Sequence, residues 1–401
     1  MYTPMTTAHK SRVLDMTQGD PFRLVLQFSM PLFCSNLLQQ LYNLTDTALA
    51  GHLLGAAALA QIGATAALYG LIMNFAFGMN NGLALTVSRY FGAGDEKGMR
   101  RAVGWMVTLS VGTSLVLTAT SLLGRGALLT LLQVPAETWD GAAAYLTVIL
   151  LGIPLTMLYN MEAALLRAVG NSITPLLFLL FSTVLNIGLD AAFMGPLDLG
   201  VRGAAIATVL AQGISALLGV WYILRSYPQL RFRPAQLKET TRHAVTHMFW
   251  AGLSMGLMSA IYNLGSVALQ SSINALGSAY IAAQTAARRL AELYFIPGGA
   301  LGIAVATFSS QNLGAGKRSR IWQSVKAALV ILRNMLQGIQ HTIEPLLASA
   351  LELIGKVIFA VWLVPVWGYR AVCFCEPTTW VICFVFILFA AWRCRGDLRD
   401  A

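Results

Sequence analysis

The chain has 401 residues, of which 57% are hydrophobic and only 11% are charged, and its mean hydropathy is +0.65. Soluble domains carry about 25% charged residues, so this composition excludes soluble enzymes, nucleic-acid-binding proteins and secreted disulfide scaffolds. The formal net charge of +10 is instead attributed to basic residues that orient the chain in a membrane. The sequence therefore predicts an all-α polytopic membrane protein.

Ten apolar stretches are long enough to cross a bilayer, because a helical span takes about 20 residues. They run at 24–50, 56–88, 102–124, 142–166, 175–195, 204–224, 245–272, 279–308, 346–366 and 371–392. With a cytoplasmic N-terminus, 21 of the 27 Lys and Arg residues fall inside, and only Arg125, Arg202 and Arg370 fall outside. The positive-inside rule then predicts that both termini are cytoplasmic.

The sequence contains an internal repeat with a gap in its second copy. Tyr42-Asn43-Leu44 recurs as Tyr262-Asn263-Leu264, and Phe91–Gly94 recurs as Leu313–Gly316. Equivalent glycines lie 76 residues apart in the first copy (94 and 170) but 22 apart in the second (316 and 338). The second copy therefore lacks about 53 residues, the length of two spans with their loop. Fused copies of one bundle are typical of secondary transporters.

The repeat predicts two pseudo-symmetric helical bundles, one of six helices and a shortened one of four. The predicted segments are a cytoplasmic N-terminal segment (1–23), a first lobe (24–224), a basic cytoplasmic linker (225–244), a second lobe (245–392) and a cytoplasmic tail (393–401). Within the second lobe, 312–343 is predicted to be a cytoplasmic connection, because Trp322–Gln340 is too short and too charged to span. A position on the membrane surface is compatible with that composition.

Several segments match motifs of a known family: Pro31-Leu32 with Asn36–Leu44 and Asp46, Ser88–Asp95, Leu166–Asn171, and Asn186–Asp190. They resemble the multidrug and toxic-compound extrusion (MATE) family, in particular its bacterial DinF-like branch, with two helices missing from the second lobe. The resemblance implies an alternating-access antiporter in the bacterial cytoplasmic membrane. It would exchange protons or sodium for bulky, often cationic compounds, with no cofactor besides the coupling ion.

Two aspartates, Asp46 and Asp190, lie inside predicted spans, where an ionisable group is costly enough to be a functional candidate. Each follows a basic residue at the cytoplasmic start of its helix by 23 residues, which is a rise of about 34 Å, so both should reach the same depth. Asn186 lies one turn from Asp190, and Thr208 begins the next helix in the same outer half. This oxygen-rich set suits a hard monovalent cation or a shared proton, or the groups pair structurally within the bundle.

The resemblance assigns the family's cation site to matching residues of the first lobe: Asp46, Asn186, Asp190 and Thr208, with Tyr42 close by. They would be metal ligands only if the coupling ion is Na⁺. The resemblance also implies that Pro31 bends its helix during transport, whereas a static kink is the alternative. Tyr145, Met73 and Met157 are candidates for an adaptable substrate cavity, or else belong to the core or face lipid.

The second copy differs chemically from the first. The repeat pairs Lys356 with Asn186, Ala360 with Asp190 and Glu376 with Thr208. Glu352 and Lys356, at i and i+4, are expected to form a structural ion pair, and so are Arg288 and Glu292. Glu376 is the candidate carboxylate of the second lobe toward a substrate cavity, with helix packing as the alternative role.

Three other functions were weighed. An intramembrane enzyme fits poorly, because the span aspartates are not clustered for magnesium and the five histidines fall at helix ends or in loops. A lipid-linked oligosaccharide flippase of the same superfamily would need several cationic residues around its cavity, and only Arg288, Arg289 and Lys356 are available. The third is a remnant that inserts without transporting.

The expected partners are the lipid bilayer and small organic cations, without nucleic acid, and the sequence leaves the oligomeric state open.

Overall fold

The computed structural model describes residues 13–132, 134–274, 276, 278–327 and 332–393. Within these ranges every regular element is a helix. The long helices are α2 (Pro21–Leu54), α3 (Ala56–Gly92), α4 (Glu96–Leu123), α6 (Ala136–Ala168), α7 (Ile173–Met194), α8 (Gly200–Ser226), α9 (Arg242–Asn274), α10 (Ser278–Gly314), α13 (Ile343–Ile358) and α15 (Tyr369–Arg393). The short ones are α5 (Arg125–Leu131), η1 (Pro228–Leu230), η2 (Pro234–Glu239), α11 (Arg318–Ala327), α12 (Leu332–Gly338), the π-helical η4 (Phe359–Leu363) and α14 (Val364–Trp367).

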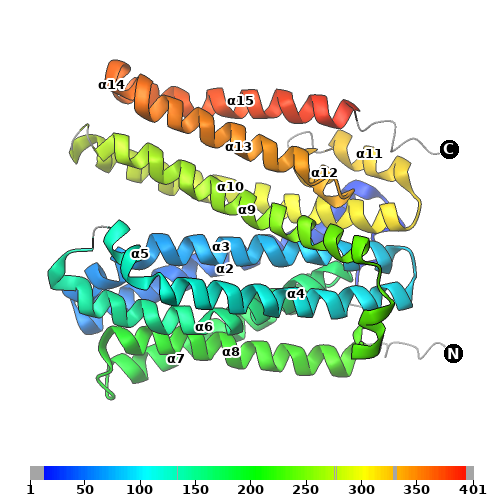
Figure 1. Ribbon diagram of the computed structural model, residues 1–401, viewed down its shortest axis with the longest axis horizontal. Coiled ribbons are helices and arrows are strands. Elements are labelled where there is room, and N and C mark those ends of the chain that lie inside the picture. The colour runs from blue at the N-terminus through cyan, green and yellow to red at the C-terminus, as the bar shows by residue number, and fades with distance from the viewer. Residues whose placement is uncertain (1–12, 133, 275, 277, 328–331, 394–401) are drawn as a thin grey trace.

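The helices form two bundles that lie one above the other (Figure 1). Helices α2 to α8 make one bundle, called the first lobe, and α9 to α15 make the other, called the second lobe. The connection through η1 and η2 joins the lobes at the end where both termini lie, and the lobes converge toward that end (Figure 1).

Among the described residues, seven helical segments are long and apolar enough to cross a membrane: α4, α6, α7, α8, Arg242–Ser266 of α9, Ile343–Trp367 and α15. Helix α3 is bent by 46° between Ala56–Ala66 and Leu68–Gly92 and gives an eighth span if the two parts count as one. Helices α2 and α10, of 34 and 37 residues, occupy the other two predicted positions. Polar residues such as Gln39 and Arg288 lower their apolar character, so length and composition alone identify eight of the ten predicted spans.

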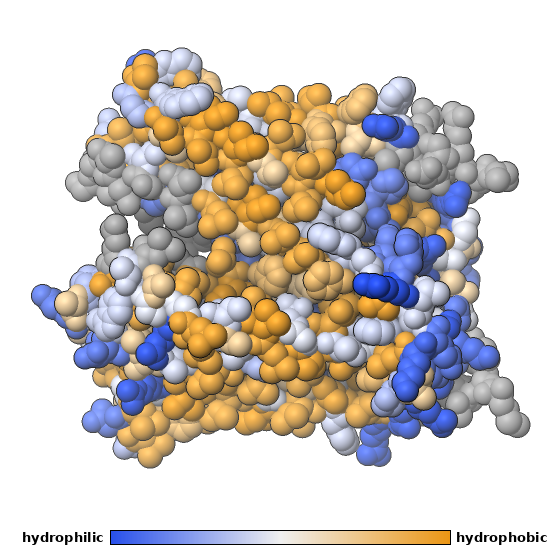
Figure 2. All heavy atoms as spheres, viewed as in Figure 1, coloured by the Kyte–Doolittle hydropathy of each residue, from blue (hydrophilic) through white to orange (hydrophobic). Residues whose placement is uncertain are grey.

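On the face shown in Figure 2, an apolar surface covers the middle of both lobes, and hydrophilic residues gather toward the two ends. Large apolar side chains such as Leu123, Trp362 and Val366 are largely exposed. A continuous exposed apolar surface is unfavourable in water but favourable in contact with the acyl chains of a bilayer.

The connection between α10 and α13 consists of the short helices α11 and α12, and residues 328–331 lie outside the described part of it. Met335 and Leu336 of α12 are fully buried, in one core with Phe308 of α10 and Ile387 of α15. Apolar burial therefore packs α12 against the second lobe, whereas the position of the connection relative to the membrane stays a prediction.

The lobes meet most closely where α3 crosses α9 and α10. Gly82 faces the backbone carbonyl of Ala251, Gly92 faces that of Gln311, and Gly314 faces that of Arg89. A side chain at any of these glycines would overlap the facing carbonyl group, so the close approach of the backbones requires glycine.

Residues 13–17, called the strap, tie the two lobes together at the same end. Leu14 N–H donates to the carbonyl of Gly170, at the end of α6, at 2.9 Å. The Asn312 amide of α10 donates to Met16 O at 3.0 Å, and Lys317 Nζ donates to Thr17 O at 2.8 Å. One short segment thus bonds to both lobes.

Candidate functional site

The predicted cation-site residues meet where α2, α7 and α8 pack together. Asp190 and Asn186 of α7 are fully buried, and Thr208 of α8 is buried beside them. The Tyr42 hydroxyl of α2 donates to Thr208 Oγ1 at 3.4 Å. The Asp46 carboxyl lies close enough to that of Asp190 for the two to interact. The spacing argument therefore named side chains that lie together in the fold.

Several polar atoms of this cluster make no hydrogen bond within the described residues. They are Asp46 Oδ1, both carboxyl oxygens of Asp190 and both polar atoms of the Asn186 amide. Buried carboxylates without partners are strongly unfavourable, so such a pair favours a proton or a cation between its oxygens. The donors are two carboxylates, an amide and a hydroxyl, and such an oxygen-rich set fits a proton or an alkali cation better than a transition metal.

A cavity of about 540 Å³ lies beside this cluster, between α2, α3, α6 and α7, with Ile303 of α10 contributing from the second lobe. Asp46 belongs both to the acidic cluster and to the cavity, because its side chain also lines the cavity. The wall combines the aromatic residues Tyr69, Phe77, Tyr145 and Tyr159 with the amides Asn36, Gln39 and Asn43. Aromatic faces, amides and one carboxylate are suited to a bulky organic cation.

The predicted cavity residues separate into two groups. Met73 and Tyr145 line the cavity. Met157 is buried in the core of the first lobe instead, and Glu376 lies in the second lobe away from the cavity lining. Helix α2 continues through Pro31, whose carbonyl oxygen accepts a hydrogen bond from Ser35 at 2.9 Å.

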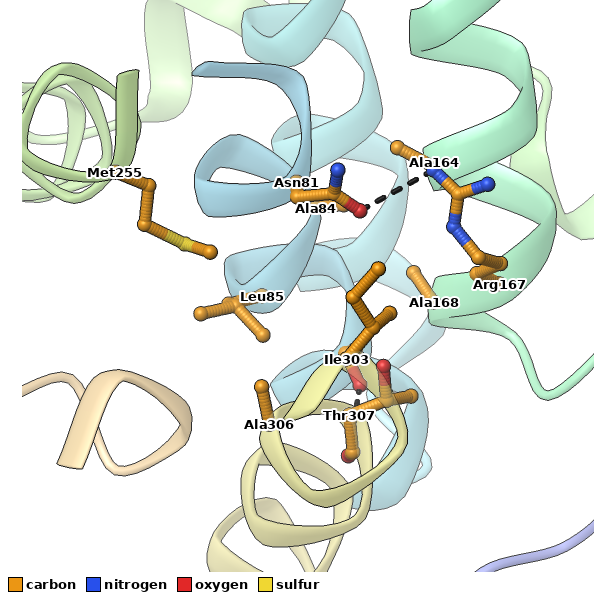
Figure 3. A pocket seen from close by; sticks show the side chains of 11 residues that line it. Asn81, Ala84, Leu85, Ala164, Arg167, Ala168, Met255, Ile303, Ala306 and Thr307 are labelled. Atoms are coloured by element: carbon orange, nitrogen blue, oxygen red, sulfur yellow. Dashed lines mark hydrogen bonds between the residues drawn. The ribbon is translucent and has the colours of Figure 1, made fainter. Parts of the chain in front are cut away.

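Arg167 also lines the cavity. Its guanidinium group donates to Asn81 Oδ1 at 3.2 Å and lies over the ring of Phe77, 5.7 Å from the centroid. Figure 3 shows Arg167 and Asn81 above a smaller pocket toward Ile303 and Thr307 of α10. The sequence analysis counted Arg167 among the cytoplasmic residues, but this side chain is buried, because an amide acceptor and an aromatic face stabilise its charge.

Glu162 of α6 is an ionisable residue that the sequence analysis missed. Its side chain is buried against Gly219 of α8, and Oε2 has no partner among the described residues. The sequence signal for it is its position within the predicted span 142–166, where a buried ionisable group is a functional candidate. The comparison of depth in the first lobe concerned only the aspartates Asp46 and Asp190.

The second lobe carries a charged cluster at the repeat-equivalent position. Lys356 Nζ lies 3.0 Å from Glu352 Oε1 and 3.3 Å from Glu376 Oε1. It also lies 4.5 Å from the ring centroid of Tyr262. The predicted Glu352–Lys356 pair is confirmed, and Glu376 joins it. The predicted pairing of Arg288 with Glu292 is untested, because the side chain of Glu292 lies outside the described part of α10.

These features define a polytopic helical membrane protein in which two lobes enclose a cavity next to a buried acidic cluster. The MatE family model matches residues 31–192 and 254–336, and the chain belongs to the MATE family. It is thus an integral membrane protein of a transporter family rather than of an enzyme family.

Individual relatives support the assignment. The protein named "Probable multidrug resistance protein YpnP" of Bacillus subtilis is 31% identical over 310 residues, which cover 77% of this chain and 69% of YpnP. The multidrug export protein MepA of Staphylococcus saprophyticus is 24% identical over 273 residues, covering 68% of this chain and 60% of MepA. A solved structure described as an outward-facing MATE transporter of the MOP superfamily superimposes with a TM-score of 0.88 at 20% identity, covering 97% of this chain and 99% of that one.

Proposed function

We propose that the chain is a cation-coupled antiporter that exports bulky organic cations or drugs from a bacterial cell. The coupling ion is a proton or Na⁺, and both termini lie in the cytoplasm. The observation that carries the proposal is the position of Asp46, which interacts with Asp190 on one side and lines the 540 Å³ cavity on the other. Asp46, Asn186, Asp190 and Thr208, with Tyr42 beside them, are called the ion cluster. Because Asp46 belongs both to the ion cluster and to the cavity wall, it can couple the binding of an ion to the binding of a substrate in the cavity.

The chemistry follows from charge balance. Without a proton or cation, Asp46 and Asp190 repel one another, and Asp46 remains available to an organic cation in the cavity. When the ion enters from outside, it neutralises the pair, and Asp46 loses its attraction for the organic cation. Ion and substrate thereby exclude each other electrostatically, which is the requirement for exchange.

The two lobes supply the two access states. The glycine contacts of α3 with α9 and α10 close the end at which the termini lie. With that end in the cytoplasm, this conformation is closed toward the inside. Opening inward requires the backbones at Gly92 and Gly314 to separate, and a bend of α2 at Pro31 is the proposed means by which the ion cluster assists that change.

The family names of the relatives support this substrate class, because YpnP is named for multidrug resistance and MepA for multidrug export. The flippase alternative has less support. Lys356, one of the three cationic residues on which it depended, is paired with two glutamates away from the cavity lining.

The test uses the purified protein in proteoliposomes loaded with a fluorescent cationic dye. A sodium or pH gradient of the correct direction should drive dye movement, and Asp46→Asn should abolish the ion-driven part. Asn36→Ala is the matched control, because Asn36 lines the same cavity outside the acidic cluster. Ion-driven transport that survives in the Asp46→Asn, Asp190→Asn double variant would refute the proposed site. Ion binding without any dye movement would favour the non-transporting remnant.

A further inference from the structure

The charged cluster of the second lobe occupies the place that the ion cluster has in the first. By the sequence repeat, Tyr262 corresponds to Tyr42, Lys356 to Asn186 and Glu376 to Thr208. In each lobe the tyrosine lies against one of the other members. Tyr42 bonds to Thr208, and the ring of Tyr262 faces the ammonium group of Lys356.

The surroundings of Lys356 are built around its side chain. Lys356 is 0% exposed, and its Cδ lies against Gly265 of α9, where a side chain would come within 3.0 Å. Its ammonium group is enclosed by Glu352 one turn away, by Glu376 of α15 and by the face of Tyr262. Three helices therefore converge on one positive charge.

The groups around Lys356 Nζ are those that bind any small monovalent cation. Two carboxylates supply oxygen ligands and negative charge, and an aromatic face attracts cations in general. Two carboxylates and one ammonium leave a formal charge of −1, with Arg288 close enough to Tyr262 to interact with it but exposed. In the first lobe the carboxylates stand at other positions of the repeat, and Asp46 Oδ1 and both carboxyl oxygens of Asp190 have no partner among the described residues.

We propose that the second lobe contains a cation site of the same kind as the first lobe, and that the Lys356 ammonium group is its covalently attached occupant. Lys356 thereby determines that an exchangeable ion binds in the first lobe only. The inference rests on the proposed ion coupling of the first lobe. Cation binding to the second lobe can nevertheless be measured separately, in full-length protein whose first lobe no longer responds to ions.

A purely structural ion pair makes a different prediction. If Lys356 only fastened α13 to α15, its removal would lower the stability equally in every salt. If it occupies a cation site, its removal leaves Glu352 and Glu376 ready to accept an external cation, and binding of that cation to the folded state raises the stability.

The experiment measures the thermal midpoint of the full-length protein in detergent, in NaCl and in choline chloride of equal ionic strength. All proteins carry Asp46→Asn and Asp190→Asn, so that the first lobe does not respond. Lys356→Ala and Lys356→Asn are the test variants, and the second recreates the residue type of Asn186. Ethylammonium chloride is a further probe, because it resembles the removed end of the lysine side chain.

We expect the parent with Lys356 intact, and the Lys356→Arg control, to show no difference between the salts. Lys356→Ala should gain about 2 °C or more in ethylammonium, and Lys356→Asn should gain a similar amount in NaCl. Adding Glu352→Gln and Glu376→Gln to either variant should remove the gain.

Folded Lys356→Ala and Lys356→Asn variants that respond to neither cation would overturn the proposal without affecting the first-lobe site. Failure of both variants to fold, even when they are purified in ethylammonium, would also count against it, since the occupant would then not be replaceable. A sodium response of the parent with Lys356 intact would instead contradict the restriction of ion binding to the first lobe.

Discussion

In the first lobe, Asp46 and Asp190 face one another while their buried oxygens have no hydrogen-bond partner among the described residues, whereas in the second lobe Glu352 and Glu376 share the ammonium group of Lys356. The two arrangements differ in what they need from outside. A carboxylate pair without a counter-charge requires a proton or a cation, and a pair that already holds an ammonium group does not. Under the proposed function, free energy from an ion gradient would enter through the first lobe.

The lobes also differ in their number of long helices. Between the ends of α3 and α7 the first lobe has the long helices α4 and α6, whereas between α10 and α13 the described residues of the second lobe form only the short α11 and α12. The second lobe thus contains the helices α9 and α10, which contact the first lobe, but its described residues form fewer long helices that pack against them. Within it, Lys356 of α13 contacts residues of α9 and α15.

The largest effect is expected from removing the acidic pair of the first lobe. Asp46→Asn and Asp190→Asn should each abolish the response of the thermal midpoint to the coupling ion, because one carboxylate alone no longer favours a cation. Asp190→Asn should also raise the stability in choline chloride, since it removes an uncompensated buried charge. Titration of the midpoint against Na⁺ and against pH measures both effects. An unchanged ion response in both variants would break the comparison between the lobes.

The next largest effect concerns the ion pair of the second lobe. Lys356→Ala should cost about 3–5 kcal/mol in the free energy of unfolding, because it leaves the buried carboxylate of Glu352 and the partly exposed one of Glu376 without their ammonium partner. Replacing Lys356 and Glu352 together by Met and Leu should cost less than Lys356→Ala alone. The exposed pair Arg100–Glu96, at 3.7 Å, is the control, and Arg100→Ala should cost about 1 kcal/mol or less. Equal losses at the two sites would contradict the assignment of Lys356.

A smaller effect is expected where the two lobes touch. Gly92→Ala and Gly314→Ala should each destabilise the closed contact by about 1–3 kcal/mol, because the new methyl group meets a backbone carbonyl of the other lobe. A cysteine placed at Ser88, which bonds to Thr307 O at 3.3 Å, should then be labelled faster by a thiol reagent. Gly112→Ala is the control, since nothing lies within 4 Å of a side chain there. Unaltered labelling in the two variants would show that the contact adapts without separating the lobes.

The smallest effect is expected at Tyr42. Tyr42→Phe removes the 3.4 Å hydrogen bond to Thr208 but keeps the aromatic ring. A bond of this length contributes about 1 kcal/mol or less, so the ion affinity should fall by less than about tenfold. Thr208→Val should give a loss of similar size, and the double variant should add little to it. A complete loss of ion binding would mean that the Tyr42 hydroxyl is itself a ligand.

The sequence predicts the helical fold well because the signals are local. Runs of apolar residues locate the long helices, and equal spacing from the cytoplasmic ends predicts that Asp46 and Asp190 meet. Apolarity is weaker for α2, whose polar residues such as Asn36 and Gln39 line the cavity, and for α10, which carries the exposed Arg288.

Tertiary contacts explain what the sequence could not give. Arg167 reads as a cytoplasmic basic residue until Asn81 and Phe77, from another helix, are known to surround it. Likewise, α12 reads as a short polar connection until its apolar side is seen to complete the core around Phe308. Glu162 is different, because its position in a predicted span was visible in the sequence.

The strap has a consequence for the order of assembly during synthesis. Met16 bonds to Asn312, a partner 296 residues later in the chain. At about 5–20 residues per second, the ribosome reaches that partner roughly 15–60 s after it makes the strap. Gly170, the strap's partner in the first lobe, is made about halfway through that interval, so during the second half the strap can bond to the first lobe but lacks its partners in α10. The joint between the lobes is therefore among the last parts of the protein to form, and a fusion partner added ahead of residue 13 would be close by when it does.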